Sequence, residues 1–147
     1  MKLSGKVAVV TGGGTGIGQG AAIALADEGA KVMVLGRRPE PLNETVQHIE
    51  KAGGEALACP ADLTDAEQIS KAVQLLQSRW GRADVLVNNA GSAMRKPFMK
   101  VTMEELDELY HIDLRSVYAV TQAFVPMLKE DGGGSIINIS SILGVLG

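Results

Sequence analysis

Short aliphatic runs alternate with helical patterns along this chain, and the alternation restricts the fold more than any other feature. The runs that predict strands occupy residues 6–11, 31–35, 55–59, 84–88 and 135–140. Most are continuous in their apolar character, which is typical of strands buried on both faces of a sheet. Helical patterns fall between them, at residues 16–28, 41–53, 64–80 and 102–129. Strands that alternate with helices predict an α/β fold with a parallel sheet and right-handed crossovers.

The same alternation predicts the order of the strands. A length of 147 residues corresponds to one domain. Over residues 1–147 we predict a three-layer, doubly wound parallel sheet of five strands in the order 3-2-1-4-5. The order reverses between strands 1 and 4, and ligands of such sheets bind at the carboxyl ends of the strands at that point.

Two sequences of the form Thr-x-x-Glu predict where helices begin. They occupy residues 64–67 and 102–105, and in such capping boxes the Thr hydroxyl accepts a backbone hydrogen bond. Pro41 is expected to open the second helix. The box at 102–105 is expected to open one long helix that reaches about Lys129.

The turn after the first strand is rich in glycine: residues 11–18 are Thr-Gly-Gly-Gly-Thr-Gly-Ile-Gly. A backbone without side chains can approach a pyrophosphate closely, and the N-terminus of the next helix presents free N–H groups. The spacing of Gly13 and Gly18 matches a P-loop, but Gln19 and Gly20 stand where that motif has Lys and Ser or Thr. The segment is therefore interpreted as the phosphate loop of a dinucleotide-binding Rossmann domain. The alternative is a tight turn that binds no ligand.

The end of the second strand discriminates between cofactors. NAD sites have Asp or Glu there for the ribose 2′-hydroxyl, whereas NADP sites have Arg for the 2′-phosphate. Here Arg37 and Arg38 follow Gly36, and Glu40 comes only after Pro39. Because a guanidinium binds phosphate through a fork of donors, the pair favours NADP, with NAD as the alternative. The competing interpretation is a pair of solvated arginines before a helix.

Three motifs make the chain similar to the short-chain dehydrogenase/reductase family. They are Thr-Gly-x-x-x-Gly-Ile-Gly at 11–18, Asn-Asn-Ala-Gly at 88–91 and the serine pair at 140–141. Asp62 and Leu63 extend the resemblance, which covers the whole chain in the expected order. It implies an oxidoreductase that transfers hydride between a nicotinamide cofactor and a ketone or secondary alcohol.

The resemblance assigns four groups of residues to the cofactor. In chain order they would hold the pyrophosphate, the 2′-phosphate, the adenine and the ribose, with Ile17 near the nicotinamide. These cofactor-binding residues are Gly12, Gly14, Thr15, Gly16, Ile17, Gly18, Arg37, Arg38, Asp62, Leu63, Asn89, Ala90 and Gly91.

The resemblance also implies catalytic residues. Ser141 matches the serine that hydrogen-bonds the carbonyl or hydroxyl of the substrate. Asp113 stands where the family has an Asn that supports a water-linked proton relay, and a carboxylate cannot donate as an amide does. The family's acid–base Tyr, with Lys four residues later, would come after Ser141 and beyond Gly147. Neither Tyr110 nor Tyr118 has Lys at that spacing.

We therefore expect residues 1–147 to be the N-terminal, cofactor-binding part of a longer enzyme, without turnover by itself. Whether the 147-residue chain is an enzyme stays open at this point. The alternatives are a non-catalytic dinucleotide-binding module and an inert fragment. In the fragment, a last strand rich in Ile136, Ile137 and Ile139 would form an uncovered edge.

Composition limits the partners. The formal net charge is −3 and the isoelectric point is about 5.4, so no nucleic acid is expected as a partner. No apolar run approaches about 18 residues, so no membrane span is expected. The single Cys59 and the lack of a secretory segment after Met1 indicate the cytoplasm, and no residues have metal-ligand spacing. The expected partners are a small carbonyl or alcohol substrate and, for the complete parent, further copies of itself in a dimer or tetramer.

Overall fold

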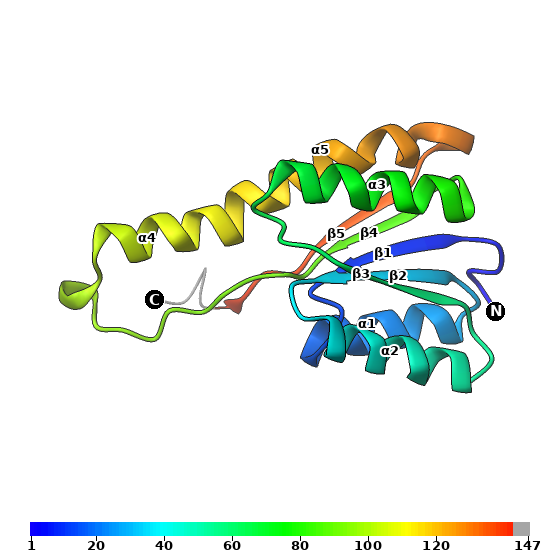
Figure 1. The fold of residues 1–147 in the computed structure, drawn as a ribbon, viewed down its shortest axis with the longest axis horizontal. Helices are drawn as coiled ribbons and strands as arrows, with labels where there is room; N and C mark the ends of the chain where they lie inside the picture. The colour runs from blue at the N-terminus through cyan, green and yellow to red at the C-terminus, as the bar shows by residue number, and fades with distance from the viewer. Residues whose placement is uncertain (143–147) are drawn as a thin grey trace.

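The computed structural model describes residues 1–142 and contains a five-stranded parallel sheet in the order β3-β2-β1-β4-β5. The predicted strand order is thus confirmed, with the reversal between β1 and β4 (Figure 1). The strands are β1 (Val7–Thr11), β2 (Lys31–Gly36), β3 (Ala56–Pro60), β4 (Val85–Asn88) and β5 (Ser135–Asn138). The α-helices are α1 (Gly16–Asp27), α2 (Pro39–Lys51), α3 (Ala66–Trp80), α4 (Met103–Tyr110) and α5 (Ser116–Lys129).

The sheet is buried between two helical layers. Helices α1 and α2 cover one face, and α3 and α5 cover the other (Figure 1). Alternate residues of β1 enter different cores: Val9 packs in the cluster that contains Phe124, whereas Val10 packs in the cluster that contains Leu42. Because both faces of each central strand are buried, the strands are apolar throughout instead of alternating apolar with polar residues.

Helix α2 begins two residues earlier than the sequence predicts. Arg38 is the N-cap residue and Pro39 takes the first helical position, instead of Pro41. A proline suits this position because its fixed φ matches the helix and its missing N–H would have no partner there.

One of the two predicted capping boxes is confirmed and the other is wrong. The Thr102 hydroxyl accepts from the Glu105 N–H, and the Glu105 carboxylate accepts from the Thr102 N–H, at the start of α4. At α3 the cap is Asp65 instead of Thr64. Thr64 instead bonds to Asp62: its N–H and its hydroxyl both donate to the Asp62 carboxylate, at 2.9 and 2.8 Å.

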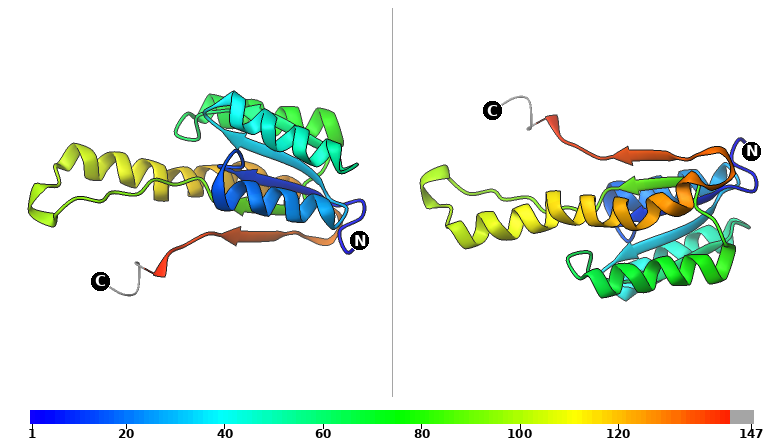
Figure 2. Two further views of the ribbon diagram at one scale, coloured as in Figure 1. Left: turned by 90° about the horizontal axis from the view of Figure 1, so that it is seen from below. Right: turned by 90° about the horizontal axis from the view of Figure 1, so that it is seen from above.

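The predicted long helix is present as an unbroken helical segment over residues 103–129, but it is not α-helical throughout. A π-helical turn, η2 (His111–Arg115), separates α4 from α5, and the Ser116 N–H donates to the His111 carbonyl. Such turns carry one extra residue and are frequent at functional sites. The α4 segment projects beyond the edge of the sheet (Figures 1 and 2), and none of its side chains is buried.

Strand β5 lies at the edge of the sheet and pairs with β4 alone among the described residues. It ends at Asn138 instead of Ser140, and Ile136, Ile137 and Ile139 are between 41% and 45% exposed. In the part of the chain that the structure describes, no helix is long and apolar enough to cross a membrane. No group of His, Cys, Asp or Glu among residues 1–142 could hold a metal ion.

Candidate cofactor-binding site

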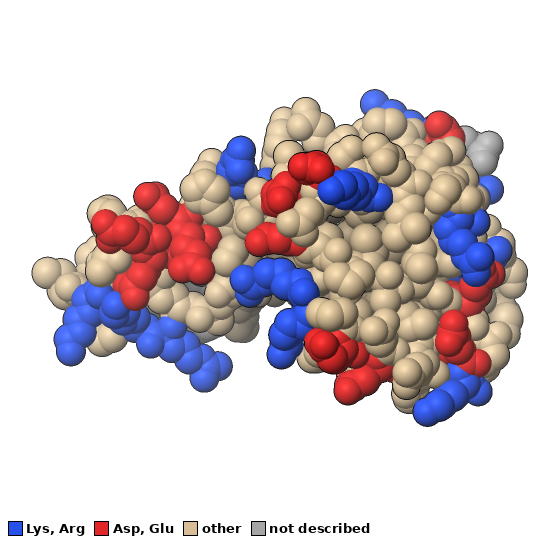
Figure 3. Space-filling model, viewed as in Figure 1, with Lys and Arg blue, Asp and Glu red and all other residues tan. Residues whose placement is uncertain are grey.

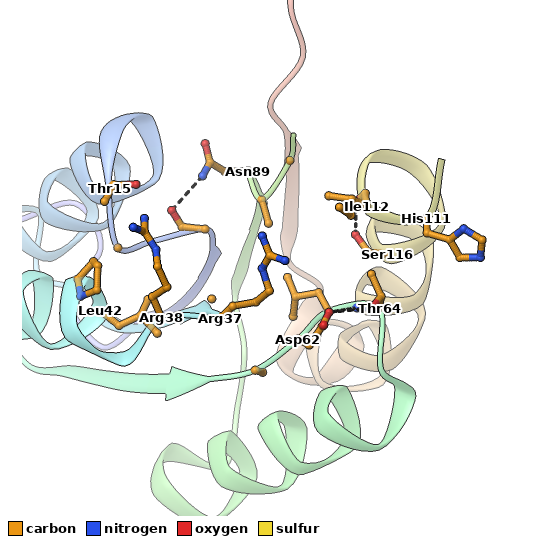
Figure 4. A pocket seen from close by; sticks show the side chains of 18 of the residues that line it. Thr15, Arg37, Arg38, Leu42, Asp62, Thr64, Asn89, His111, Ile112 and Ser116 are labelled. Carbon is orange, nitrogen blue, oxygen red and sulfur yellow. Dashed lines mark hydrogen bonds between the residues drawn. The ribbon is translucent and has the colours of Figure 1, made fainter. Parts of the chain in front are cut away.

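A cavity of about 1030 Å³ opens at the carboxyl ends of β1 to β4, where the strand order reverses (Figure 4). Its walls come from the four turns that follow these strands and from the segment around η2. The lining residues are Gly12, Gly14, Thr15, Ile17, Gly36, Arg37, Arg38, Pro41, Leu42, Ala61, Asp62, Leu63, Thr64, Asn89, Ala90, Gly91, Glu108, His111, Ile112 and Ser116. The strand order predicts a ligand at the carboxyl ends of the strands, and the structure has a cavity there.

The glycine-rich turn after β1 packs where no side chain would fit. Gly12 has φ +63°, and a Cβ there would lie 2.8 Å from Asn89 Nδ2. A Cβ on Gly18 would collide with the Gly12 carbonyl and with the same Asn89 amide. The turn therefore closes against the turn after β4, and its bare backbone lines the cavity at Gly12 and Gly14.

The N-terminus of α1 is left without a side-chain cap. Thr15 is the N-cap residue, but its hydroxyl makes no capping hydrogen bond, and the first turn contains no acidic residue. Asp65 and Thr102 do cap their helices. The free N–H groups and the positive end of the helix dipole of α1 are thus available to an anion beside the cavity.

The turns after β1 and β4 are joined by Thr11 and Asn89. The Thr11 hydroxyl accepts from the N–H groups of Asn89 and Ala90, both at 2.9 Å, and donates to the Val87 carbonyl at 3.3 Å. Asn89 Nδ2 donates to the Thr11 carbonyl at 2.9 Å and to the Gly12 carbonyl at 3.3 Å (Figure 4). These bonds hold the two turns together across the point where the strand order reverses.

Asn88 does not line the cavity, and its side chain joins β4 to a neighbouring strand and a helix. Its Nδ2 donates to Thr121 Oγ1 and to Asn138 Oδ1, both at 2.9 Å, so it ties β4 to α5 and to β5.

Two arginines supply positive charge to the cavity. Arg37 and Arg38 both line it (Figure 4), and neither forms an ion pair with another residue among residues 1–142. Across from them, hydrogen bonds from the Thr64 N–H and hydroxyl lower the pKa of Asp62, and the charge of Arg37 lowers it further. The cavity therefore has two guanidinium groups free for an anionic ligand and one carboxylate that is already engaged.

The chain is matched over residues 6–147 by the family model described as short chain dehydrogenase. It belongs to the short-chain dehydrogenase family.

Relatives in this family share about a third of its residues. It is 36% identical over 142 residues to the 7alpha-hydroxysteroid dehydrogenase of Escherichia coli K12, covering 97% of this chain and 55% of that protein. It is 35% identical over 147 residues to the 3-oxoacyl-[acyl-carrier-protein] reductase FabG of Thermotoga maritima, covering 100% and 60%. The chain thus spans little more than half the length of these relatives.

Solved structures of short-chain dehydrogenases have the same fold. A metagenomic short-chain oxidoreductase in complex with NADP superimposes with a TM-score of 0.90 at 38% identity, over 97% of this chain and 65% of that one. A 7 alpha-hydroxysteroid dehydrogenase complexed with NADH and 7-oxo glycochenodeoxycholic acid gives 0.93 at 35% identity, over 98% and 56%.

Most of the residues that the family resemblance implies for the cofactor line the cavity together; Gly16 and Gly18 instead shape the loop behind it. Ile112 and Ser116 are wall residues that the sequence does not point to, because the π turn that places them has no recognisable pattern. The Ser116 hydroxyl donates to the Ile112 carbonyl within this turn (Figure 4).

The two residues predicted to be catalytic do not line the cavity. Asp113 is exposed on η2, and its Oδ1 accepts from the Ser92 N–H at 2.7 Å. Ser141 is exposed and follows β5. Their catalytic roles stay predictions.

Proposed function

We propose that this chain binds NADP(H) in the cavity at the carboxyl edge of the sheet. In the whole protein it would be the cofactor-binding part of an oxidoreductase acting on a ketone or secondary alcohol. The observation that carries the proposal is the joint placement of an uncapped helix N-terminus, a glycine cradle and two unpaired arginines around one cavity. The helix N-terminus and the glycine cradle suit the pyrophosphate of a dinucleotide, and the arginines suit a 2′-phosphate.

The fit can be followed along the cavity. The backbone of residues 12–18 and the first turn of α1 would bind the pyrophosphate, and Asp62 with Leu63 would flank the adenine. Asn89, Ala90 and Gly91 would border the ribose, and Ile17, which is 68% exposed in the cavity wall, would face the nicotinamide. The bound cofactor would supply or accept the hydride.

We propose NADP over NAD because of Arg37 and Arg38. An arginine gives a 2′-phosphate a fork of charged donors, whereas the 2′-hydroxyl of NAD requires an acceptor, and no carboxylate stands at the end of β2. One related structure holds NADP and another NADH, so the preference rests on the residues of this chain.

The substrate would be a small molecule with a carbonyl or a secondary alcohol. The relatives are named for a hydroxysteroid and for an oxoacyl group. Ser141 would donate to or accept from the reacting oxygen, and Asp113 would fix the turn after β4 through Ser92. The proposed reaction with this substrate belongs to the whole enzyme, of which residues 1–147 would be one part.

The proposal includes self-association of the whole protein through the projecting arm, which consists of α4, η2 and the start of α5. Five apolar side chains at helical spacing along α4, η2 and α5 are between 47% and 72% exposed: Met103, Leu106, Tyr110, Leu114 and Tyr118. Acidic and basic side chains lie next to one another elsewhere on the arm (Figure 3). A second copy would cover this stripe and form a dimer, or a tetramer with a further interface.

Calorimetric titration of the 147-residue chain tests the cofactor proposal. We expect NADPH to bind at least about tenfold more tightly than NADH, the range of one charged hydrogen bond, and ATP to bind more weakly than either. Absence of heat with both dinucleotides at millimolar concentration would contradict the proposed function.

A further inference from the structure

Thr45 lies outside the cavity but contacts the loop that forms its floor. It stands in the middle of α2, and its side chain is fully buried, with 0% exposed. Its hydroxyl lies 3.0 Å from the Gly13 carbonyl oxygen and 3.1 Å from the Pro41 carbonyl oxygen. It also accepts a hydrogen bond from Gln19 Nε2 on α1 at 3.1 Å. One hydroxyl thus joins α1, α2 and the glycine-rich loop.

Part of this arrangement is ordinary helix chemistry. A Thr inside a helix commonly donates to the carbonyl four residues earlier, which here belongs to Pro41. The contact with Gly13 is different, because it crosses 32 residues of sequence and ends on the phosphate loop. Gln19 donates to the Thr45 oxygen, and the single hydroxyl proton of Thr45 is shared between the Gly13 and Pro41 carbonyls.

The orientation of the Gly13 carbonyl decides where the next N–H points. In a trans peptide the C=O and the N–H point in opposite directions. A Gly13 carbonyl held toward Thr45 therefore turns the Gly14 N–H away from α2. Gly14 lines the cavity, and its N–H donates no hydrogen bond to another residue in the part of the chain that the structure describes.

The two glycines that flank this peptide are tightly packed. A Cβ on Gly13 would lie 2.7 Å from Val34 Cγ1 on β2, and one on Gly14 would lie 3.0 Å from Pro41 Cβ. The loop is thus clamped between β2 and the first turn of α2. Within this packed loop, the Thr45 hydroxyl holds the Gly13 carbonyl toward α2.

We propose that Thr45 is a positioning residue that aims the Gly14 N–H at the pyrophosphate of the bound dinucleotide. This inference rests on the proposed function. It also gives α2 two tasks: its N-terminal end carries Arg38 beside the 2′-phosphate, and its interior orients the pyrophosphate loop through Thr45.

The test compares Thr45→Val, which keeps the shape and removes the hydroxyl, with Thr45→Ser, which keeps the hydroxyl. Binding of NADPH and of adenosine 2′-monophosphate is measured by calorimetry; the second ligand has the adenine and 2′-phosphate but no pyrophosphate. Thr45→Val should weaken NADPH binding about tenfold and change adenosine 2′-monophosphate binding less than twofold, and Thr45→Ser should restore most of the NADPH affinity.

Three outcomes would overturn the inference: unchanged NADPH binding by Thr45→Val, equal weakening of both ligands, or no rescue by Ser. If Thr45→Val does not fold, Thr45→Ala, which also removes the hydroxyl, takes its place, and unchanged NADPH binding by that variant overturns the inference as well. The unmodified chain is titrated first. If it binds neither ligand, the proposed function fails and the inference with it; if it binds both, a negative result with the variants concerns Thr45 alone.

Discussion

Arg37 and Arg38 are the residues on which the choice of cofactor depends. Replacing Arg37 by Asp exchanges a donor for the 2′-phosphate for an acceptor suited to the 2′-hydroxyl. We expect Arg37→Asp to weaken NADPH binding by roughly 10- to 100-fold, the range of one charged hydrogen bond, and to leave NADH binding equal or tighter. Calorimetry with both cofactors measures the change.

Arg95→Asp is the matched control for that experiment, because it makes the same charge change at an exposed residue that does not line the cavity. It should leave the ratio of the two affinities within about twofold. An unchanged preference in Arg37→Asp would mean that Arg37 does not bind the 2′-phosphate.

Asp84 is a buried residue whose ionisation stabilises the fold. It is only 6% exposed and accepts from Lys6 Nζ at 3.0 Å, Arg82 Nη2 at 2.6 Å and the Val7 N–H at 2.9 Å. Burial raises the pKa of the carboxyl, but the hydrogen bonds from Arg82, Val7 and Lys6 outweigh it and lower the pKa to about 2. Because the folded pKa is the lower one, the stabilisation is complete above the unfolded value of 3.8 and is lost as pH falls from there toward 2.

Urea unfolding of Asp84→Asn at two pH values tests this assignment. At pH 7 the variant should lose about 2 kcal/mol of unfolding free energy, and its deficit should shrink as the pH falls toward 2. Glu67→Gln, which breaks an exposed ion pair on α3, is the control and should change stability by less than about 0.5 kcal/mol. A deficit independent of pH would show that the carboxylate charge is not what stabilises the site.

At the scale of elements, two neighbouring residues, Thr64 and Asp65, are candidates for the N-cap of α3. The structure assigns the cap to Asp65, and Thr64 bonds to Asp62 instead. Asp65→Ala should cost about 1 kcal/mol of unfolding free energy at pH 7, the usual worth of an N-cap, and Thr64→Ala less than half of that. Chemical denaturation of the two variants measures both losses, and a larger loss in Thr64→Ala would restore the assignment that the sequence suggested.

The central elements could be predicted from the sequence because their patterns have a single physical explanation. β1, β2 and β4 are buried on both faces, so their apolar runs are unbroken, and the glycine-rich turn marks the end of β1. The π turn at η2 could not be predicted, because its wider hydrogen bonds leave no pattern of side chains. For the same reason, the sequence does not indicate that Ile112 and Ser116 line the cavity.

The roles of Thr64 and Thr45 show a second limit of the sequence. Thr64 and Asp65 are both good caps by residue type, and only the position of the Asp62 carboxylate decides between them. Thr45 looks like an ordinary helix residue until α2 is placed against Gly13. Long-range contacts of single hydroxyl groups are set by tertiary packing, and no local pattern encodes them.

At the scale of the whole molecule, the exposed stripe on the projecting arm should drive self-association. We expect light scattering to give a mass above 15.4 kDa for the chain, and Leu114→Glu to return it to the monomer mass, because a buried charge without a partner disfavours the interface. Leu75→Glu on α3, an exposed leucine outside the stripe, is the control. A monomeric unmodified chain, or equal effects of the two variants, would contradict the assignment.

The cofactor site depends on the whole sheet, because four turns that are far apart in sequence meet at one edge. A smaller cavity of about 310 Å³ lies near Gly53 and Gly54, at the amino ends of β2 and β3, and no arginine lines it. The two cavities can therefore be compared for NADPH binding within one molecule.

Nuclear magnetic resonance of the isotope-labelled chain titrated with NADPH tests the central claim most directly. The account predicts that backbone amide signals of Gly12, Gly14, Ile17 and Arg37 shift in a saturable way, while those of Gly53 and Gly54 stay in place. Shifts centred on Gly53 and Gly54, or no shifts at saturating NADPH, would contradict it.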